Sequence, residues 1–143
     1  MKGPIQSVEV TYLVHATEDP GKLEAAVMSL FSASRTPELE RLEGHFGNEI
    51  LKARLHLTGE EAVKAFNSMT ASMSKGLKKQ VVDGLGESVD EHSALFLRFD
   101  KQRVVSGSLT PGVGDSIRVK VKPRIYLVKG GAIGFYSQLF EAD

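Results

Sequence analysis

With 143 residues, of which 41% are hydrophobic and 25% charged, the chain has ordinary globular composition, and we expect one domain over residues 1–143. Lysine and arginine balance the acids at 18 each, so an anion-binding surface requires local concentration of charge, and the lack of cysteine excludes thiol catalysis and thiolate metal sites. Without a signal-peptide pattern or an apolar run of about 18 residues, we expect a cytoplasmic protein with no membrane segment.

The first third of the chain alternates strand and helix patterns. Residues 8–14 alternate apolar and polar side chains with a period of two, which predicts a strand. Residues 17–31 combine capping residues and a proline with apolar residues at helical spacing, which predicts a helix. Two further strands are predicted over residues 39–46 and 50–57, joined by a hairpin turn at Gly47-Asn48.

A second, longer helix is predicted next. Thr58 and Glu61 have capping-box spacing, and an apolar stripe runs on to Leu77, although Gly76 weakens the case for a continuous helix. Residues 84–90 then predict a loop. Three lysines are expected at the C-terminal end of this helix, where the helix dipole favours cations: Lys75, Lys78 and Lys79.

Positive charge is concentrated late in the chain. Residues 98–129 carry eight lysines or arginines and two aspartates, a local charge of +6. Residues 95–99 and 117–122 alternate apolar residues with cations, the pattern of half-buried strands. Between them, residues 101–106 predict either a helical turn or a strand continuation, and residues 107–115 a looser glycine-rich connection.

The predicted elements define a fold class. Apolar residues at helical spacing predict a third helix over residues 130–143, which gives the order β-α-β-β-α-β-β-α. This order predicts an α+β two-layer sandwich, with a mixed or antiparallel sheet and helices packed on one face. The other face would then display cations from separate strands: Lys52, Arg54, Arg98, Arg118 and Lys120.

Such a face has two interpretations. Cations on strands about 4.8 Å apart suit phosphates, and Phe96 beside Arg98 suits the stacking of an unpaired base, so the face favours salt-sensitive nucleic-acid binding. The same alternation also keeps a solvated sheet face soluble and an edge strand unpaired. Residues 44–48 are similarly either a contact loop or only a hairpin turn that needs Gly and Asn.

Signals for catalysis are weak. The four histidines lack metal-binding spacing, and the glycines after residue 106 match no phosphate-binding loop. We therefore expect no enzymatic activity, no cofactor and no metal. A deep pocket with a buried histidine beside a carboxylate would favour catalysis instead.

Three segments resemble an archaeal family of predicted RNA-binding proteins with a proposed exosome association: residues 14–19, 43–48 and 95–102. The resemblance implies a fold like that of the 5S-RNA-binding ribosomal protein, with RNA as the ligand and the exosome or other RNA-processing proteins as partners. By position, it implies contacts from five residues: His45, Phe46, Arg98, Lys101 and Gln102.

Together these patterns and the resemblance predict a non-catalytic RNA-binding protein, which the resemblance implies is an accessory factor in RNA processing. The alternative is a protein-interaction or homodimerisation module that uses the apolar C-terminal helix. The predicted RNA-binding residues are His45, Phe46, Lys52, Arg54, Arg98, Lys101, Gln102, Arg103, Arg118, Lys120, Lys122 and Arg124.

Overall fold

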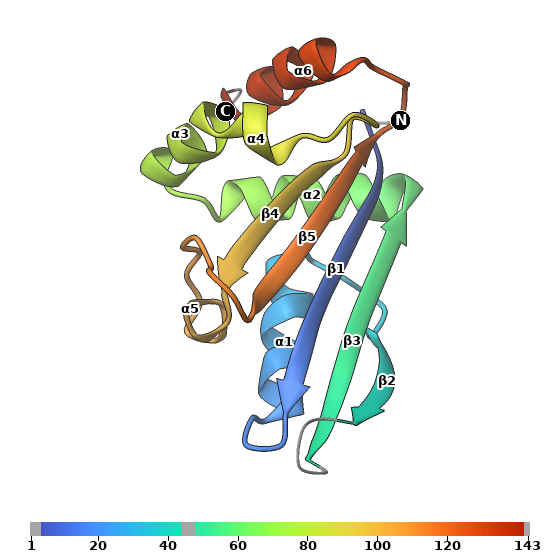
Figure 1. The fold of residues 1–143 in the computed structure, drawn as a ribbon, viewed down its shortest axis with the longest axis vertical. Coiled ribbons are helices and arrows are strands. Elements are labelled where there is room, and N and C mark those ends of the chain that lie inside the picture. Colours follow the sequence, from blue (N-terminus) through green and yellow to red (C-terminus); the bar gives the residue numbers. More distant parts are fainter. Residues whose placement is uncertain (1–3, 44–47, 142–143) are drawn as a thin grey trace.

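The computed structural model describes residues 4–43 and 48–141, which form an open five-stranded antiparallel sheet and its helices (Figure 1). The strand order is β2-β3-β1-β5-β4. The strands are β1 (Ile5–His15), β2 (Glu38–Glu43), β3 (Glu49–Thr58), β4 (Leu95–Asp100) and β5 (Ser116–Pro123). The helices are α1 (Pro20–Leu30), α2 (Gly59–Ala71), α3 (Lys75–Asp83), α4 (Leu85–Ser88), α5 (Lys101–Val105) and α6 (Lys129–Glu141).

The predicted α+β class is confirmed, and one face of the sheet is left open. In Figure 1, α1 and α2 lie behind the sheet, whereas α3, α4 and α6 gather beyond the end where β5 finishes. No helix crosses the front of the sheet in this view. Among the residues described, the helices are all too short or too polar to cross a membrane.

Alternation along β1, the central strand, determines which residues enter the core. Val10 is buried and lies opposite Leu55 of β3 and Val119 of β5 on the helix-covered face. Since successive side chains of a strand point to opposite faces, its neighbour Thr11 points to the open face. The same register places Arg54 and Arg118 on either side of Thr11.

Local sequence signals start α1 as predicted. The Asp19 side chain accepts hydrogen bonds from the backbone N–H groups of Gly21 (2.9 Å) and Lys22 (3.3 Å), and Pro20 occupies the first turn. These bonds satisfy N–H groups that have no partner within the helix. The helix then packs Leu23 and Val27 into the core.

The long helix predicted after residue 58 is wrong in one respect, because it is two helices. Met73 and Leu77 are both buried, so the apolar stripe continues across a break in the backbone. Ser74 makes that break: its hydroxyl accepts from the Leu77 N–H at 3.1 Å and begins α3. The predicted capping box is also wrong, since the Thr58 side chain makes no capping hydrogen bond.

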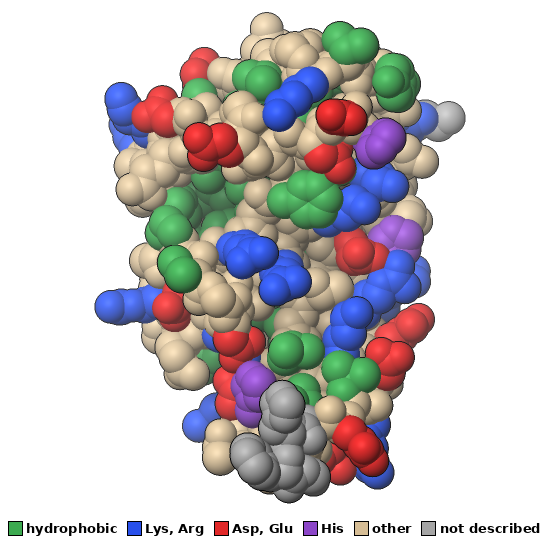
Figure 2. Space-filling model, viewed as in Figure 1, with side chains coloured by type: hydrophobic (Ala, Val, Ile, Leu, Met, Phe, Trp, Pro, Cys, Tyr) green, Lys and Arg blue, Asp and Glu red, His purple; other side chains and the backbone are tan. Residues whose placement is uncertain are grey.

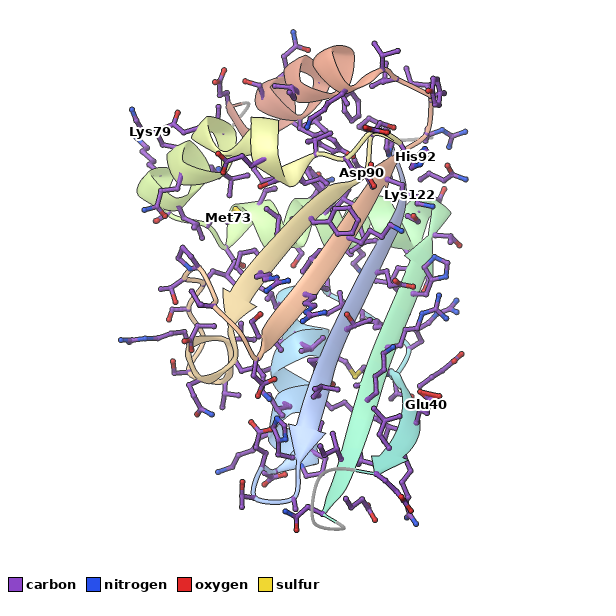
Figure 3. The ribbon with its side chains drawn as sticks, in the orientation of Figure 1. Glu40, Met73, Lys79, Asp90, His92 and Lys122 are labelled. Carbon is purple, nitrogen blue, oxygen red and sulfur yellow. The ribbon has the colours of Figure 1, made fainter. Side chains whose placement is uncertain are left out.

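Because of this break, the three lysines do not lie at the end of a helix as predicted. Lys75 is the first residue of α3, so the lysines lie along α3 rather than at the end of a longer helix. Figure 3 shows Lys79 pointing away from the molecule and Met73 in the connection between α2 and α3. The predicted loop at residues 84–90 likewise contains the short helix α4.

The connection between β4 and β5 is more ordered than expected. Residues 101–105 form α5, and the following segment returns along β4, where the Asp100 N–H donates to Thr110 O and the Gly112 N–H to Arg98 O, both at 3.0 Å. A Cβ atom at Gly112 would lie 2.6 Å from the Phe99 carbonyl carbon, so the approach requires glycine. This segment covers the outer edge of β4.

The C-terminal helix α6 packs against its own chain. The Phe140 ring meets the Phe66 ring edge to face, with centroids 5.5 Å apart. The Tyr136 hydroxyl is buried and lies 2.7 Å from Ser93 O and 3.1 Å from Val121 O. Burial, reinforced by the charge of Asp90, raises the pKa of Tyr136. The apolar side of α6 therefore completes the core, which does not support the alternative function of a partner-docking helix.

Candidate nucleic-acid interface

Cations from separate strands meet on the open face of the sheet. In one row across four strands, Arg54, Thr11, Arg118 and Arg98 lie side by side in register. Figure 2 shows this face, with Lys and Arg side chains in a band across the middle of the sheet. The predicted placement is confirmed for all five strand cations, which point away from the helices: Lys52, Arg54, Arg98, Arg118 and Lys120.

Arg98 and Arg118, called here the arginine pair, lie directly opposite each other on β4 and β5. Like charges at directly opposite positions of an antiparallel pair are destabilising. Both side chains are exposed, and within residues 4–43 and 48–141 no carboxylate forms an ion pair with either. Their guanidinium donors are therefore available to an external anion, for which Arg geometry is well suited.

Arg54 is different, because it has an internal partner. Its Nε donates to Glu9 Oε2 at 2.6 Å, from the neighbouring strand β1. The pair is partly exposed, so its contribution to stability is small, but the carboxylate offsets the positive charge on this side of the arginine pair.

Phe96 places an aromatic ring on the same face. Its side chain is 45% exposed, and it lies opposite Lys120, whose Nζ is 5.5 Å from the ring centroid. This distance is within cation–π range, and such a contact holds an exposed ring in place. The result is a solvent-facing aromatic surface next to the arginine pair.

Two hollows join into one groove along β1 and β5. The first, of about 410 Å³, lies among Phe96, Lys120 and the arginine pair. The second, of about 490 Å³, lies farther along the strands and is bordered by Lys52 and His15. Thr11 and Arg118 line both hollows, so the two adjoin each other, and together they are called here the groove.

Other predicted site residues lie away from this groove. Lys122 is on the open face but at the end of β5, close to Asp90 and His92 in Figure 3, and Arg124 follows the strand. Gln102 and Arg103 are exposed on α5, which packs against α1 at the β4 edge of the sheet. His45 and Phe46 lie outside the described residues.

Lys101 requires a correction, because the structure buries it. Only 4% of its side chain is exposed, and its Nζ donates to Leu13 O at 2.7 Å and to Glu18 Oε1 and Asp115 Oδ2 at 2.9 Å each. A buried ammonium with three oxygen partners is not available to RNA. Lys101 instead ties together the end of β1, the start of α1 and the start of β5.

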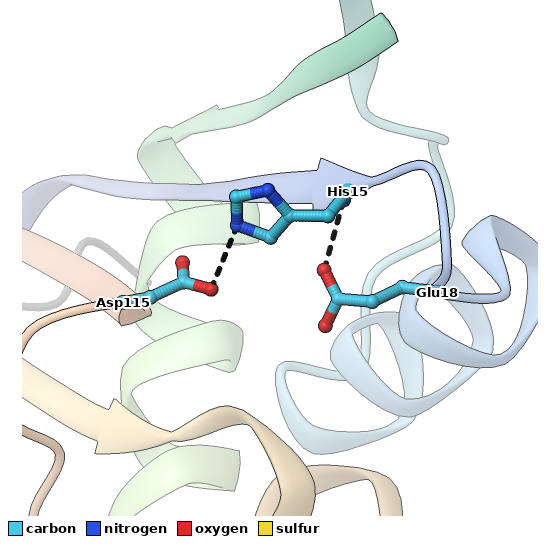
Figure 4. A group of neighbouring side chains, drawn as sticks. All are labelled: His15, Glu18 and Asp115. Carbon is cyan, nitrogen blue, oxygen red and sulfur yellow. Dashed lines mark hydrogen bonds and ion pairs between the residues drawn. The ribbon is translucent and has the colours of Figure 1, made fainter. Parts of the chain in front are cut away.

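His15 joins this cluster from β1. Its Nε2 lies 2.9 Å from Asp115 Oδ2, and its backbone N–H donates to Glu18 Oε1 at 2.9 Å (Figure 4). Sequence spacing did not indicate this group, because its members come from positions as far apart as 15 and 115.

The cluster has the composition of a metal site but already contains a cation. His15, Glu18 and Asp115 offer ligand atoms within 4.8 Å of one another. The Lys101 ammonium, however, lies 2.9 Å from an oxygen of each carboxylate and would repel a divalent ion there. The His15 side chain is 39% exposed, so the buried histidine that would favour catalysis is not found here.

Asp115 makes the cluster sensitive to acid. Burial acts to raise its pKa, but the hydrogen bond and charge of Lys101, followed by those of His15, outweigh burial and lower the pKa of Asp115. Because the pKa is lower in the folded protein, the carboxylate stabilises the fold above its unfolded pKa. This stabilisation is lost as the pH falls through the folded value.

Asp115→Asn is therefore expected to lower the free energy of unfolding by about 1 kcal/mol at pH 7, a modest amount because the side chain is partly exposed. The difference from the native chain should start to shrink as the pH falls below about 4 and should vanish below the lowered pKa of Asp115, where both proteins carry a neutral side chain. Urea unfolding at a series of pH values measures it. A difference that stays constant down to about pH 2 would contradict this account of the cluster.

The fold and this face define a two-layer α+β protein with a basic groove on an open antiparallel sheet. Residues 7–123 match a family described as RNA binding, and the chain belongs to this family. The family predicted from the sequence is thereby confirmed.

The chain is similar along its length to archaeal proteins. RNA-binding protein PAB1135 of Pyrococcus abyssi is 30% identical over 142 residues, covering 93% of this chain and 92% of that protein. The structure of Mth689, a DUF54 protein from Methanothermobacter thermautotrophicus, is 29% identical with a TM-score of 0.79, covering 97% of this chain and all of that one. The structure of AF2318 from Archaeglobus fulgidus is 28% identical with a TM-score of 0.80, covering 94% of this chain and 99% of that one.

Proposed function

We propose that the protein binds RNA along the groove on the open face of its sheet and acts without catalysing a reaction. The observation that carries this proposal is the arginine pair. Two guanidinium groups at directly opposite positions, with no described carboxylate partner, repel each other in the free protein. A phosphate bound between them removes this repulsion and accepts hydrogen bonds from both.

The rest of the groove is consistent with a polyanionic ligand that carries flat bases. Lys52 and Lys120 extend the positive charge along the strands on either side of the arginine pair. Phe96 adds an exposed ring of the kind on which bases stack. Membership of the RNA-binding family selects RNA among polyanions. A role as accessory factor in RNA processing, including contact with the exosome, stays a prediction of the family resemblance.

An NMR titration tests where RNA binds. We expect backbone amide shifts on adding a short RNA to cluster at Thr11, Phe96 and the arginine pair, because these line the groove. Amides of α1 and α2 that face away from the sheet should move least, since the sheet separates them from the groove. The largest shifts on α2 or α3, with none on β4 and β5, would contradict the proposal.

A further inference from the structure

We infer that the groove selects single-stranded RNA, with one unpaired base stacked on Phe96 and the adjoining backbone held by the arginine pair. This inference rests on the proposed function and deepens it by naming the form of RNA bound. Three features of the open face carry it: the exposed ring, the narrowness of the uncompensated positive charge, and the course of the groove.

Among RNA ligands, the exposed ring of Phe96 suits one with an unpaired base. Phe96 leaves 45% of its side chain in water although its cross-strand neighbours on this face are Lys120 and, beyond it, Glu9. Stacking on a base covers this apolar surface. In a duplex, both faces of each base are already covered by adjacent base pairs, and only base edges and the backbone reach a protein surface.

The region of the open face whose positive charge no carboxylate offsets is narrow. On β3, Arg54 is offset by Glu9, and the β2 margin beyond carries acids, with Glu38 opposite Arg54 and Glu40 opposite Lys52. Figure 3 shows Glu40 at this margin. The arginine pair, which has no described carboxylate partner, lies on two adjacent strands, β4 and β5, roughly 5 Å apart. One phosphodiester backbone fits this track, and a second backbone placed toward β3 and β2 would meet these acids.

The groove also runs in a direction that one strand can follow. Phe96 and Lys120 form one row across the sheet, and the arginine pair forms the next, two residues along each strand or about 7 Å away. The second hollow, with Lys52 at its border, continues the same course. A strand with its base on Phe96 therefore places successive phosphates over the arginine pair and then near Lys52.

The test compares an unstructured single-stranded RNA with a blunt RNA duplex that has the same number of phosphates, by fluorescence anisotropy. We expect the single strand to bind more tightly by about ten-fold, because only an unpaired base can stack on Phe96. Phe96→Ala should weaken single-strand binding roughly 5- to 150-fold and leave duplex binding unchanged, and Phe96→Tyr should retain tight binding because the ring remains. Tyr126→Ala is the matched control, since Tyr126 is 77% exposed but outside the groove, and should have no effect.

The outcomes separate this inference from the proposed function. If neither RNA binds, the proposed function fails. If both bind equally, or if Phe96→Ala has no effect, the selection of single strands is overturned. If substitution of the arginine pair still weakens binding in that case, RNA lies on the open face and the proposed function stands. Circular dichroism of each variant confirms that it is folded before its affinity is compared.

Discussion

Replacing Arg98 and Arg118 together by alanine is expected to weaken RNA binding by about 10- to 100-fold at moderate salt, because each loses charge-assisted hydrogen bonds to phosphate. The fold should not suffer. Both side chains are exposed, and their removal relieves the repulsion between like charges on opposite strands. Anisotropy with a labelled RNA measures the affinity, and thermal unfolding is expected to show an unchanged or slightly raised Tm.

The matched control removes the same charge from the other side of the molecule. Lys22 and Lys64 are exposed on α1 and α2, which lie behind the sheet. The double alanine variant of these lysines should bind RNA within about two-fold of the native chain, since distant exposed charges are largely screened. Equal losses in the two double variants would mean that net charge, and not the open face, determines affinity.

The second large effect is expected at Lys101, where Lys101→Met should lower the free energy of unfolding by about 3 kcal/mol. Removing the ammonium leaves Glu18 and Asp115 close together without their shared cation, and removes the donor to Leu13 O. Loss of one partner from a buried charge cluster costs about 3–5 kcal/mol, and the partial exposure of both carboxylates places this site at the lower end. Urea unfolding at pH 7 measures it.

Lys64→Met is the comparison for Lys101→Met, because it makes the same chemical change at an exposed helix position and should shift stability by no more than about 0.5 kcal/mol. Corrected for the folded fraction, RNA affinity should be unchanged in Lys101→Met. A stable Lys101→Met protein that no longer binds RNA would indicate that Lys101 takes part in RNA binding, and would contradict its structural role.

The face that carries the cations was predictable because strand alternation is local. A period of two in residues 117–122 and 50–57 separates cations from core residues without knowledge of the fold. Register is not local. That Arg98 lies opposite Arg118 depends on the path of the chain through α5 and the segment that returns along β4, which no period in the sequence reports.

The partners of individual charges were also beyond prediction. Arg54 and Lys101 look alike in sequence, each a cation in or next to a strand. In the fold, Glu9 reaches Arg54 across 45 positions and Glu18 reaches Lys101 across 83. These contacts partly neutralise Arg54 and give Lys101 a structural role. Because neither contact is visible in the sequence, the predicted RNA-binding set includes both residues.

The prediction of the helix boundary near residue 74 failed for a related reason. The apolar stripe through Met73 and Leu77 reports burial, and both residues are indeed buried. Burial was maintained although the backbone turned at Ser74, so the stripe concealed the end of α2. Ser74 itself was the available signal for a helix boundary, because serine is more favourable at the N-cap of a helix than in its interior.

The salt dependence of binding tests the central claim most directly. A plot of log Kd against log salt concentration, measured with one single-stranded RNA, should be less steep for the double alanine variant of the arginine pair than for the native chain. The expected difference in slope is about 0.7, since the arginine pair holds one phosphate and each phosphate contact of a single strand contributes about 0.7. Equal slopes would show that Arg98 and Arg118 do not contact phosphate.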